Sequence, residues 1–361
     1  MKPEKIIEKS IKSFFITLMG LLINENKAAV IPDIRQAKSA LVLRPDRLGD
    51  FILAVPAISL LRQKLNKDAK MTIVAGKRGE DIARLFFSRD DIIVYNRNLF
   101  SFIKVCLKLF LSRCDFVINF HSYPFSMTSA IMTLASKCKI RIGFKEAGEK
   151  NELGHKIYNK GVVLYNDILH ESQKDMMLLK PLKLGFAGKI RMPEIVLPDK
   201  PVQIAKDFYK EHGIKEKDFV IGIHPTLKKK DNRWEKKNYR DLILAAQKKY
   251  KAKTVVVYGL GEEDEIKVFR QIIEGIKDAF ILQNNGILDI MAAAQRFNKF
   301  VCNDSGIMHA VSLVSDTVAI FGPSTAKRWS PIGDNKVVIL QKKDGNCDSV
   351  SVKEVLRKIS G

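Results

Sequence analysis

Several nucleotide- and metal-binding motifs are absent from the 361-residue sequence. It contains no GxxxxGK[ST] P-loop, and the glycine turn near its C-terminal end lacks the GxGxxG spacing of dinucleotide-binding folds. Asp-x-Asp, HExxH and clustered Cys and His residues are missing too, so no motif for holding a divalent cation is present. We therefore expect neither a bound metal nor a cofactor.

Cysteine is scarce. The chain has five, none of them in a CxxC pair: Cys106, Cys114, Cys138, Cys302 and Cys347. An odd count without metal-ligand spacing indicates a reducing compartment. Since a free cysteine is usually a small buried side chain, we expect all five to be structural thiols.

Long hydrophobic runs are also lacking, because a bilayer span takes about 20 apolar residues. The longest candidate, Phe14–Ile23, is shorter, and the polar segment Asn24–Lys27 follows it instead of a signal-peptide cleavage site. Four lysines precede it: Lys2, Lys5, Lys9 and Lys12. We interpret residues 1–38 as a basic amphipathic extension that lies on an anionic membrane, and the alternative is a helix packed on the first domain.

Acidic residues are outnumbered, since 62 Lys and Arg against 40 Asp and Glu give a net charge of +22. Such a charge favours anionic partners: nucleic acid, acidic lipid, nucleotides or phosphorylated glycans. The lysines are dispersed over many helical segments, and no nucleic-acid-binding module is recognisable. We expect no nucleic acid partner, although a basic nucleic-acid-binding protein remains the alternative from a different functional class.

Short apolar runs alternate with helical-period segments through most of the chain, which is typical of βαβ units and a mostly parallel sheet. Strands are predicted at Ala40–Arg44, Met71–Ala75, Ile92–Tyr95, Phe116–Asn119 and Lys139–Ile142, and then at Phe219–Ile223, Thr254–Tyr258, Ala279–Leu282, Phe300–Asn303 and Thr317–Phe321. Pro193, Pro198 and Pro201 separate the two series. We expect two doubly wound α/β domains, 39–198 and 199–345, facing a cleft, with a tail helix in 346–361 that returns to the first domain.

Two strand-to-helix junctions carry ionisable residues: Arg44–Asp50 after the first strand, and Asp304–His309 after Asn303. Unpaired amides and the positive end of a helix dipole meet at such junctions, which therefore attract anions. Asp50 is either a base kept ionised by the helix terminus or a plain N-cap. His309 either reaches the same anion as Ser305 or packs in the core.

Three further loops can complete an anion site. The basic loop His224–Trp234 can neutralise a leaving group, although a charge run is more often simply solvated. A carboxylate of the run Glu262–Asp264 can hold ribose hydroxyls, or the run is a negatively charged first helical turn. The loop Phe321–Thr325 offers the Ser324 hydroxyl for the same phosphates.

The two junctions resemble the paired motifs of glycosyltransferase family 9, the ADP-heptose:lipopolysaccharide heptosyltransferases. Arg44–Asp50 with Pro56 is similar to its Gly-Asp motif, and Asp304–His309 followed by Phe321–Ser324 is similar to its Asp-Thr-Gly-x-x-His and Gly-Pro-Thr motif. The resemblance begins at about Ser39 and implies a GT-B fold of two Rossmann-like domains around an interdomain cleft. The first would bind the acceptor and the second the nucleotide sugar. Heptose would pass from ADP-heptose to the inner core of lipopolysaccharide by inverting, metal-independent transfer.

The resemblance also implies the site residues. Asp50 would be the general base. The donor would be held by Asp304, Ser305, Gly306, Ile307, Met308, His309, Glu263, Thr226, Lys230, Arg233, Gly286 and Ser324, and the acceptor by Arg47, Gly49, His121 and Arg141. Asn232 stands where the family usually has lysine, so Lys230 or Arg233 is expected to replace it.

The partners implied are ADP-heptose or a related nucleotide sugar and a lipid-linked phosphorylated glycan. The implied location is the cytoplasm, peripheral to the inner membrane. The alternative within the family is another nucleotide sugar donor for a cell-surface glycan.

Overall fold

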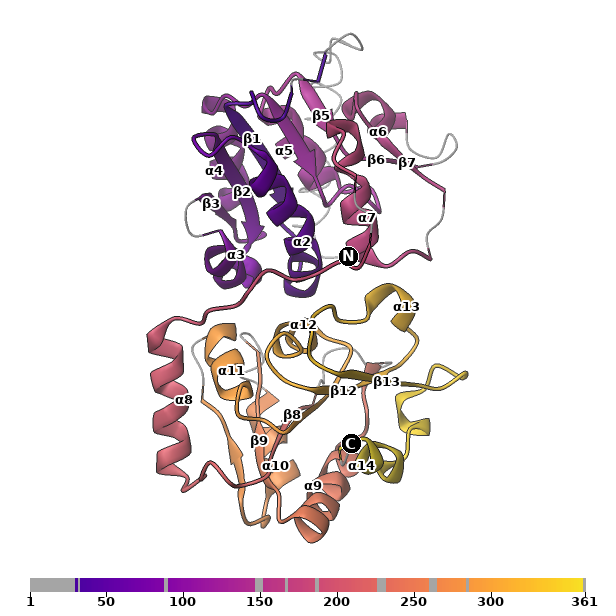
Figure 1. Cartoon of the computed structure of the whole chain (residues 1–361). Coiled ribbons are helices and arrows are strands. Elements are labelled where there is room, and N and C mark those ends of the chain that lie inside the picture. Colours follow the sequence, from indigo (N-terminus) through magenta and orange to yellow (C-terminus); the bar gives the residue numbers. More distant parts are fainter. Residues whose placement is uncertain are drawn as a thin grey trace. The chain divides into compact units, whose positions relative to one another are not determined.

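The computed structural model divides the chain into two compact units, Met1–Pro193 and Glu194–Gly361 (Figure 1). It describes residues 30–31, 33–87, 90–146, 152–165, 168–185, 188–225, 232–259, 265–283 and 286–359. The boundary falls just before the expected one, at the start of the proline-rich connection. The helix expected in the N-terminal extension lies outside the described residues.

The first unit is built on a five-stranded parallel sheet. Its strands are β1 (Ser39–Arg44), β2 (Lys70–Gly76), β3 (Asp91–Tyr95), β4 (Phe116–Asn119) and β5 (Ile140–Ile142). Their order is β3-β2-β1-β4-β5, and every pairing is parallel. They confirm the five strands predicted in this half, because buried apolar runs are what a sheet covered on both faces requires. A separate parallel pair consists of β6 (Phe144–Glu146) and β7 (Val162–Leu164).

Helices cover both faces of this sheet. They are α2 (Leu48–Lys64), α3 (Glu80–Phe86), α4 (Leu99–Leu111), α5 (Met127–Ala135), α6 (Glu152–Ile157) and α7 (Glu171–Met177). Right-handed crossovers lead outward from β1 to β3 and then back to β4, so α2 and α3 lie on one face and α4 and α5 on the other. Val105 and Leu109 of α4 and Met132 of α5 are buried in the core beneath this second pair.

The second unit has a six-stranded parallel sheet. Its strands are β8 (Val220–His224), β9 (Lys253–Val256), β10 (Ala279–Ile281), β11 (Lys299–Asn303), β12 (Thr317–Phe321) and β13 (Val337–Gln341). The order is β10-β9-β8-β11-β12-β13. The first five confirm the prediction, and β13 is an additional edge strand. The helices are α8 (Asp199–Glu211), α9 (Lys236–Tyr250), α10 (Ile266–Ile273), α11 (Ile287–Ala294), α12 (Gly306–Val311), α13 (Ala326–Trp329) and α14 (Val352–Ile359).

Both sheets have the same strand order. In each, the second and third strands are added on one side of the first strand, and the fourth strand then pairs with the other side of the first. The reversal falls between β1 and β4 in the first unit and between β8 and β11 in the second. In open α/β sheets, ligands bind outside the carboxyl ends of strands at this switch point. The two predicted junctions follow β1 and β11, so each lies at the switch point of its own unit.

The tail helix is a correction to the predicted domains. We expected it on the first domain, but α14 packs against α9 of the second unit, and Val355 and Ile359 are buried in that unit's core. The segment leading to it is also anchored there, because the Trp234 indole donates a hydrogen bond to the Val350 carbonyl at 2.8 Å. The amphipathic pattern of the helix showed that it packs on something but carried no information about which domain.

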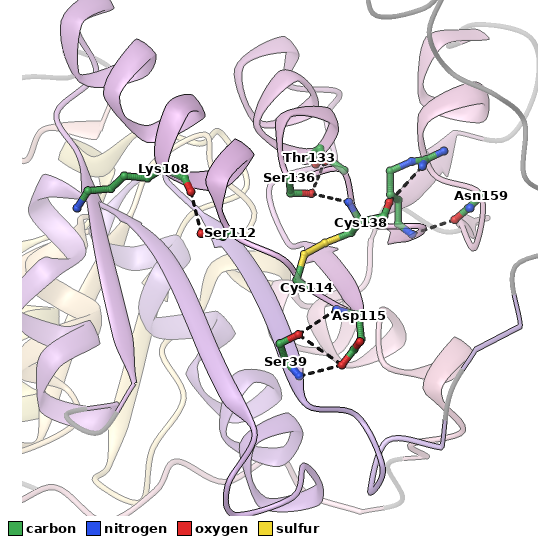
Figure 2. Close-up of a disulfide and its surroundings, with 10 residues drawn as sticks. Ser39, Lys108, Ser112, Cys114, Asp115, Thr133, Ser136, Cys138 and Asn159 are labelled. Atoms are coloured by element: carbon green, nitrogen blue, oxygen red, sulfur yellow. Dashed lines mark hydrogen bonds between the residues drawn. A yellow bond between two sulfur atoms is a disulfide. The ribbon is translucent and has the colours of Figure 1, made fainter.

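The cysteine prediction is wrong for one pair, since Cys114 and Cys138 form a disulfide (Figure 2). Each lies two residues before the first paired positions of β4 and β5, where Phe116 stands opposite Ile140. This equal offset on adjacent parallel strands brings the two Cα atoms within 5.5 Å, a distance that a disulfide requires. Cys106 and the two cysteines of the second unit are free thiols, as expected, but the cysteine count no longer indicates a reducing compartment.

No helix among the described residues combines the length and apolar character needed to cross a membrane. The same residues contain no group of three or more His, Cys, Asp or Glu side chains placed to hold a metal ion.

Candidate functional site

The first-unit junction is a short turn between a buried strand and a buried helix. β1 ends at Arg44, which is only 3% exposed, and α2 begins at Leu48 with Arg47 as its N-cap. Asp50 therefore lies inside the first turn of α2 and is not the N-cap residue that the alternative reading proposed. Gly76 at the end of β2 allows the turn to pack closely, because a Cβ atom there would lie 2.5 Å from the Asp46 carbonyl oxygen.

Arg44 is the centre of a buried cluster of charges. Its guanidinium lies 3.4 Å from Asp46 Oδ1, 3.9 Å from Asp50 Oδ1 and 3.7 Å from Asp175 Oδ2 on α7. It also donates hydrogen bonds to the main-chain carbonyls of Asp50, at 3.1 Å, and of Phe120. These bonds fix the guanidinium between the ends of β1 and β4 and the start of α2.

Three carboxylates around one cation cannot all ionise easily in a buried place. Burial, together with the Asp46 carboxylate, raises the pKa of Asp50 to about 6, against the opposing effect of Arg44 and Arg47. Burial also raises the pKa of Asp175 well above the usual aspartate range, which Arg44 only partly offsets. We expected the helix terminus to keep Asp50 ionised, but its surroundings raise its pKa instead, and the side chain is mostly ionised only above about pH 6.

Arg44 itself stays charged throughout. Burial alone would lower its pKa, but the carboxylates of Asp175, Asp46 and Asp50 raise it above the ordinary arginine value. Because the guanidinium is fixed and the Asp50 side chain is still 17% exposed, Asp50 is the member of the cluster that can meet a ligand. A partly exposed carboxylate with a pKa near neutrality is suited to accept a proton.

The structure brings three of the four predicted acceptor residues to this place. Arg47 and Gly49 belong to the turn itself. His121 follows β4, and burial, with the Arg44 charge, lowers the pKa of its imidazole to about 4, so the ring is neutral at pH 7. Its backbone N–H donates to Asn119 Oδ1 at 3.0 Å, which fixes the chain as it leaves β4.

Arg141 lies elsewhere in the first unit. It is on β5, and its guanidinium donates hydrogen bonds to the carbonyls of Ile157, at 2.6 Å, and Cys138, at 3.3 Å. Burial lowers the pKa of this arginine. These contacts give Arg141 a role in joining β5 to the end of α6.

The second-unit junction is a capped helix start at the end of β11. Ser305 is the N-cap of α12, and its Oγ accepts a hydrogen bond from the Met308 amide at 3.2 Å. The Met308 amide is thus used within the helix, although the expected anion site counted it. The amides of Gly306 and Ile307 in the same first turn have no such side-chain cap in the described structure. His309 is only 4% exposed, as the core-packing reading predicted.

Other predicted donor residues surround this helix start. Ser324 donates a hydrogen bond from its hydroxyl to Asp304 Oδ2 at 2.7 Å, which ties the loop after β12 to the junction. The Ser305 hydroxyl also lies 3.4 Å from Nδ1 of His224, the last residue of β8. The carboxyl ends of β8, β11 and β12 therefore converge on Ser305 and Asp304.

The remaining donor residues divide into two groups. Gly286 is the N-cap of α11 in an extended conformation, and Arg233 is exposed at the end of the basic loop. Thr226, Lys230 and Glu263 lie outside the described residues. Asn232, at the position where the family usually has lysine, is only 4% exposed. Of the two expected replacement cations, Lys230 and Arg233, the structure describes only Arg233.

Three buried polar residues at the two switch points were not predicted from the sequence: Asp175, Asn119 and Asn303. Asp175 is far along the chain from Asp50, and no local pattern marks it. Asn119 and Asn303 are both completely buried at the ends of equivalent strands, β4 and β11. A polar residue that closes an apolar strand was the available signal for these two.

The two parallel sheets wound in the same order define a GT-B protein, and solved structures of this fold match most of the chain. A family 9 glycosyl transferase from Veillonella parvula matches with a TM-score of 0.77 at 19% identity, covering 91% of this chain and 97% of that one. An ADP-heptose lps heptosyltransferase II from E. coli matches with a TM-score of 0.71 at 15% identity, covering 89% and 97%. The E. coli heptosyltransferase WaaC, solved with ADP, gives 0.69 at 14% identity, covering 89% and 99%.

A search of curated proteins finds no match. The family model of glycosyltransferase family 9 (heptosyltransferase) matches residues 106–359, well over half of the sequence. The chain belongs to this family.

Proposed function

We propose that this glycosyltransferase moves a heptose from ADP-heptose to the inner core of lipopolysaccharide, by an inverting and metal-independent reaction in which Asp50 is the general base. The observation that supports it most directly is the state of Asp50. Its carboxylate is partly exposed at the switch point of the first unit, and burial and Asp46 raise its pKa to about 6. A general base is most effective when its pKa lies near the working pH.

The reaction balances with one base and one leaving group. Asp50 takes the proton of the acceptor hydroxyl as that oxygen forms a bond to the anomeric carbon. The bond from the anomeric carbon to the diphosphate oxygen breaks on the opposite face, through an oxocarbenium-like state, and ADP leaves with the bonding electrons. A single displacement of this kind inverts the anomeric configuration.

The second unit would bind the ADP. The Ser305 hydroxyl and the amides of Gly306 and Ile307 lie at the start of α12, where fixed dipoles can stabilise negative charge on phosphate without rearranging. His224 is buried beside Ser305, with its Nδ1 3.4 Å from the hydroxyl, and would hold that hydroxyl in place. Arg233 is exposed and carries the cation nearest in sequence to the family lysine position.

The choice of donor and acceptor follows the relatives. One matching E. coli structure is an ADP-heptose lps heptosyltransferase, and another was solved with ADP-2-deoxy-2-fluoro heptose. The net charge of +22 suits a phosphorylated glycan acceptor. Since that acceptor is lipid-linked, we place the enzyme in the cytoplasm at the inner face of a membrane.

The test is a panel of nucleotide sugars followed by a transfer assay. ADP-heptose should raise the apparent melting temperature of the full chain and should donate heptose to a heptose-deficient lipopolysaccharide core. Ser305→Ala should reduce the thermal shift, whereas Lys353→Ala, at an exposed position of the same unit, should not. A shift with another nucleotide sugar alone would replace the donor, and no shift with any of them would overturn the proposed function.

A further inference from the structure

α4 of the first unit has an outer face that is unusually apolar for a surface helix. Six of the eleven large hydrophobic side chains that are exposed in the described part of the chain lie on it: Leu99, Phe100, Ile103, Leu107, Phe110 and Leu111. Phe100 is 80% exposed and Leu111 is 81% exposed. Soluble proteins rarely present such a contiguous patch unless it contacts a partner or a membrane.

The six side chains form a single stripe. At 3.6 residues per turn they fall within an arc of about 120° around the helix axis. The opposite side of α4 packs on the core through Phe102, Val105 and Leu109. The helix is therefore apolar on both sides, a pattern expected when both sides leave water.

Basic side chains border this stripe on both edges. Lys104 and Lys108, both exposed, follow it along one edge of the helix. On the other edge Lys137, from the turn after α5, places its ammonium 3.3 Å from the centre of the Phe110 ring. Arg113 is exposed just beyond the end of α4, and residues 99–113 include no Asp or Glu.

We infer that the outer face of α4 docks on an anionic membrane surface, which gives the proposed membrane contact a defined location. The helix has 13 residues, about 20 Å of length, so it would lie along the interface rather than cross it. Its Phe and Leu side chains would enter the boundary between headgroups and acyl chains. The lysines would extend their amines to the lipid phosphates on either side.

Charge decides between a membrane and the other possible occupants. A second copy of this chain would bring the same basic borders against each other, and like charges across an interface are unfavourable. The N-terminal segment before residue 30 has five lysines and three glutamates, so it would also add net positive charge beside the basic borders of the stripe. An anionic lipid surface is the occupant that matches both the apolar stripe and its positive borders.

The experiment is flotation of the full chain with vesicles of phosphatidylglycerol and phosphatidylcholine. The triple variant Phe100→Ser/Leu107→Ser/Leu111→Ser should bind at least about tenfold more weakly, since it removes most of the apolar area available for insertion. Lys104→Glu/Lys108→Glu should weaken binding to these vesicles, and both variants should keep the melting temperature of the wild type. A matched control on the second unit, Leu244→Ser/Lys248→Glu, should leave binding unchanged, because Leu244 is also an exposed hydrophobic residue but has no such stripe around it.

A second measurement locates the contact directly. In Phe100→Trp, the new indole should be quenched by brominated lipid, whereas in Leu244→Trp it should not. Vesicle binding that survives the triple variant without quenching at position 100 would overturn the inference. So would a lipid-free dimer that the triple variant converts to a monomer, which would assign the stripe to a second copy.

These outcomes are separable from the proposed function. The α4 variants should transfer sugar to a short, soluble acceptor as fast as the wild type does, because none of the changed residues belongs to the site. A chain that binds vesicles through α4 but transfers no heptose would refute the activity alone.

Discussion

The two units place different chemistry at the same point of the same winding. At the end of β1, three carboxylates surround the Arg44 guanidinium in a nearly dry environment. At the switch point of the second unit, the Ser305 hydroxyl lies 3.4 Å from His224 Nδ1 at the end of β8, and the Asp304 carboxylate accepts a hydrogen bond from the Ser324 hydroxyl. The winding supplies the location, and the side chains supply the chemistry.

Both switch points contain a buried asparagine that is hydrogen-bonded to a buried tyrosine. Asn119 ends β4 and donates to the Tyr158 hydroxyl at 2.7 Å, whereas Asn303 ends β11 and accepts from the Tyr239 hydroxyl at 2.7 Å. Each pair is buried, so the amide and the phenol satisfy each other where water cannot. The difference between the units therefore lies in the charged residues added around a common polar anchor.

The sharpest test of this contrast separates the two switch points by function. Asp50→Asn keeps the shape of the side chain but removes the proposed base, so transfer should fall by about 10²–10⁴-fold. Calorimetric titration with ADP should be unchanged, because the residues that we propose to bind the nucleotide belong to the second unit. Asp68→Asn, an exposed carboxylate of the first unit, is the control and should alter neither. Normal turnover in Asp50→Asn would remove the base from the mechanism.

A second test measures whether Arg44 and the three carboxylates around it are energetically coupled. Arg44→Met leaves three buried carboxylates without their cation and should lower the free energy of unfolding by about 3–5 kcal/mol. Arg35 also pairs with an aspartate, at 3.3 Å, but its side chain is 82% exposed. Arg35→Met should therefore cost less than about 0.5 kcal/mol in denaturant titrations. Equal costs for the two would show that the cluster is not coupled.

A third test uses pH. The folded-state pKa of Asp50 is about 6, above the ordinary 3.8, so the folded state binds the proton more tightly than the unfolded state. Ionised Asp50 therefore lowers stability as pH rises from about 4 to 6. Asp50→Asn should gain about 1–3 kcal/mol over the wild type at pH 8 and nothing at pH 3.5. Wild-type transfer should rise with pH through the same range, and a flat profile for both quantities would contradict the raised pKa.

The smallest expected effect concerns the shared anchor. Tyr158→Phe and Tyr239→Phe each remove a buried tyrosine hydroxyl that is hydrogen-bonded to an asparagine. Each should lower the free energy of unfolding by about 1 kcal/mol. Tyr165→Phe should have no effect, because that side chain is 86% exposed. A cost in one unit only would mean that the two anchors are not equivalent.

The sequence was most informative where a local pattern determines the structure. Buried strands such as Phe116–Asn119 are apolar runs of the right length, and the two junctions carry recognisable motifs. Asp175 could not be found in this way, because its closeness to Arg44 depends on how α7 packs against α2. The Cys114–Cys138 pair needed the register of β4 and β5, because the predicted strands, Phe116–Asn119 and Lys139–Ile142, put the two cysteines at unequal offsets.

Exposure was the other quantity that the sequence could not supply. Leu99–Leu111 reads as a helix, but its apolar residues occupy every side, and only the packing shows which side is covered. His309 illustrates the same point within the site, since a histidine at a helix start can face ligand or core with equal ease. The structure buries it.

The attachment of α14 to the second unit governs how that unit can be produced alone. A fragment cut at residue 345, where the sequence pattern placed the domain end, would lose Val355 and Ile359 from its interior and the carbonyl that receives the Trp234 indole. It would expose an apolar groove along α9 and should aggregate. A recombinant fragment of the second unit should instead run from about residue 194 through Ile359, with any affinity tag on its amino end.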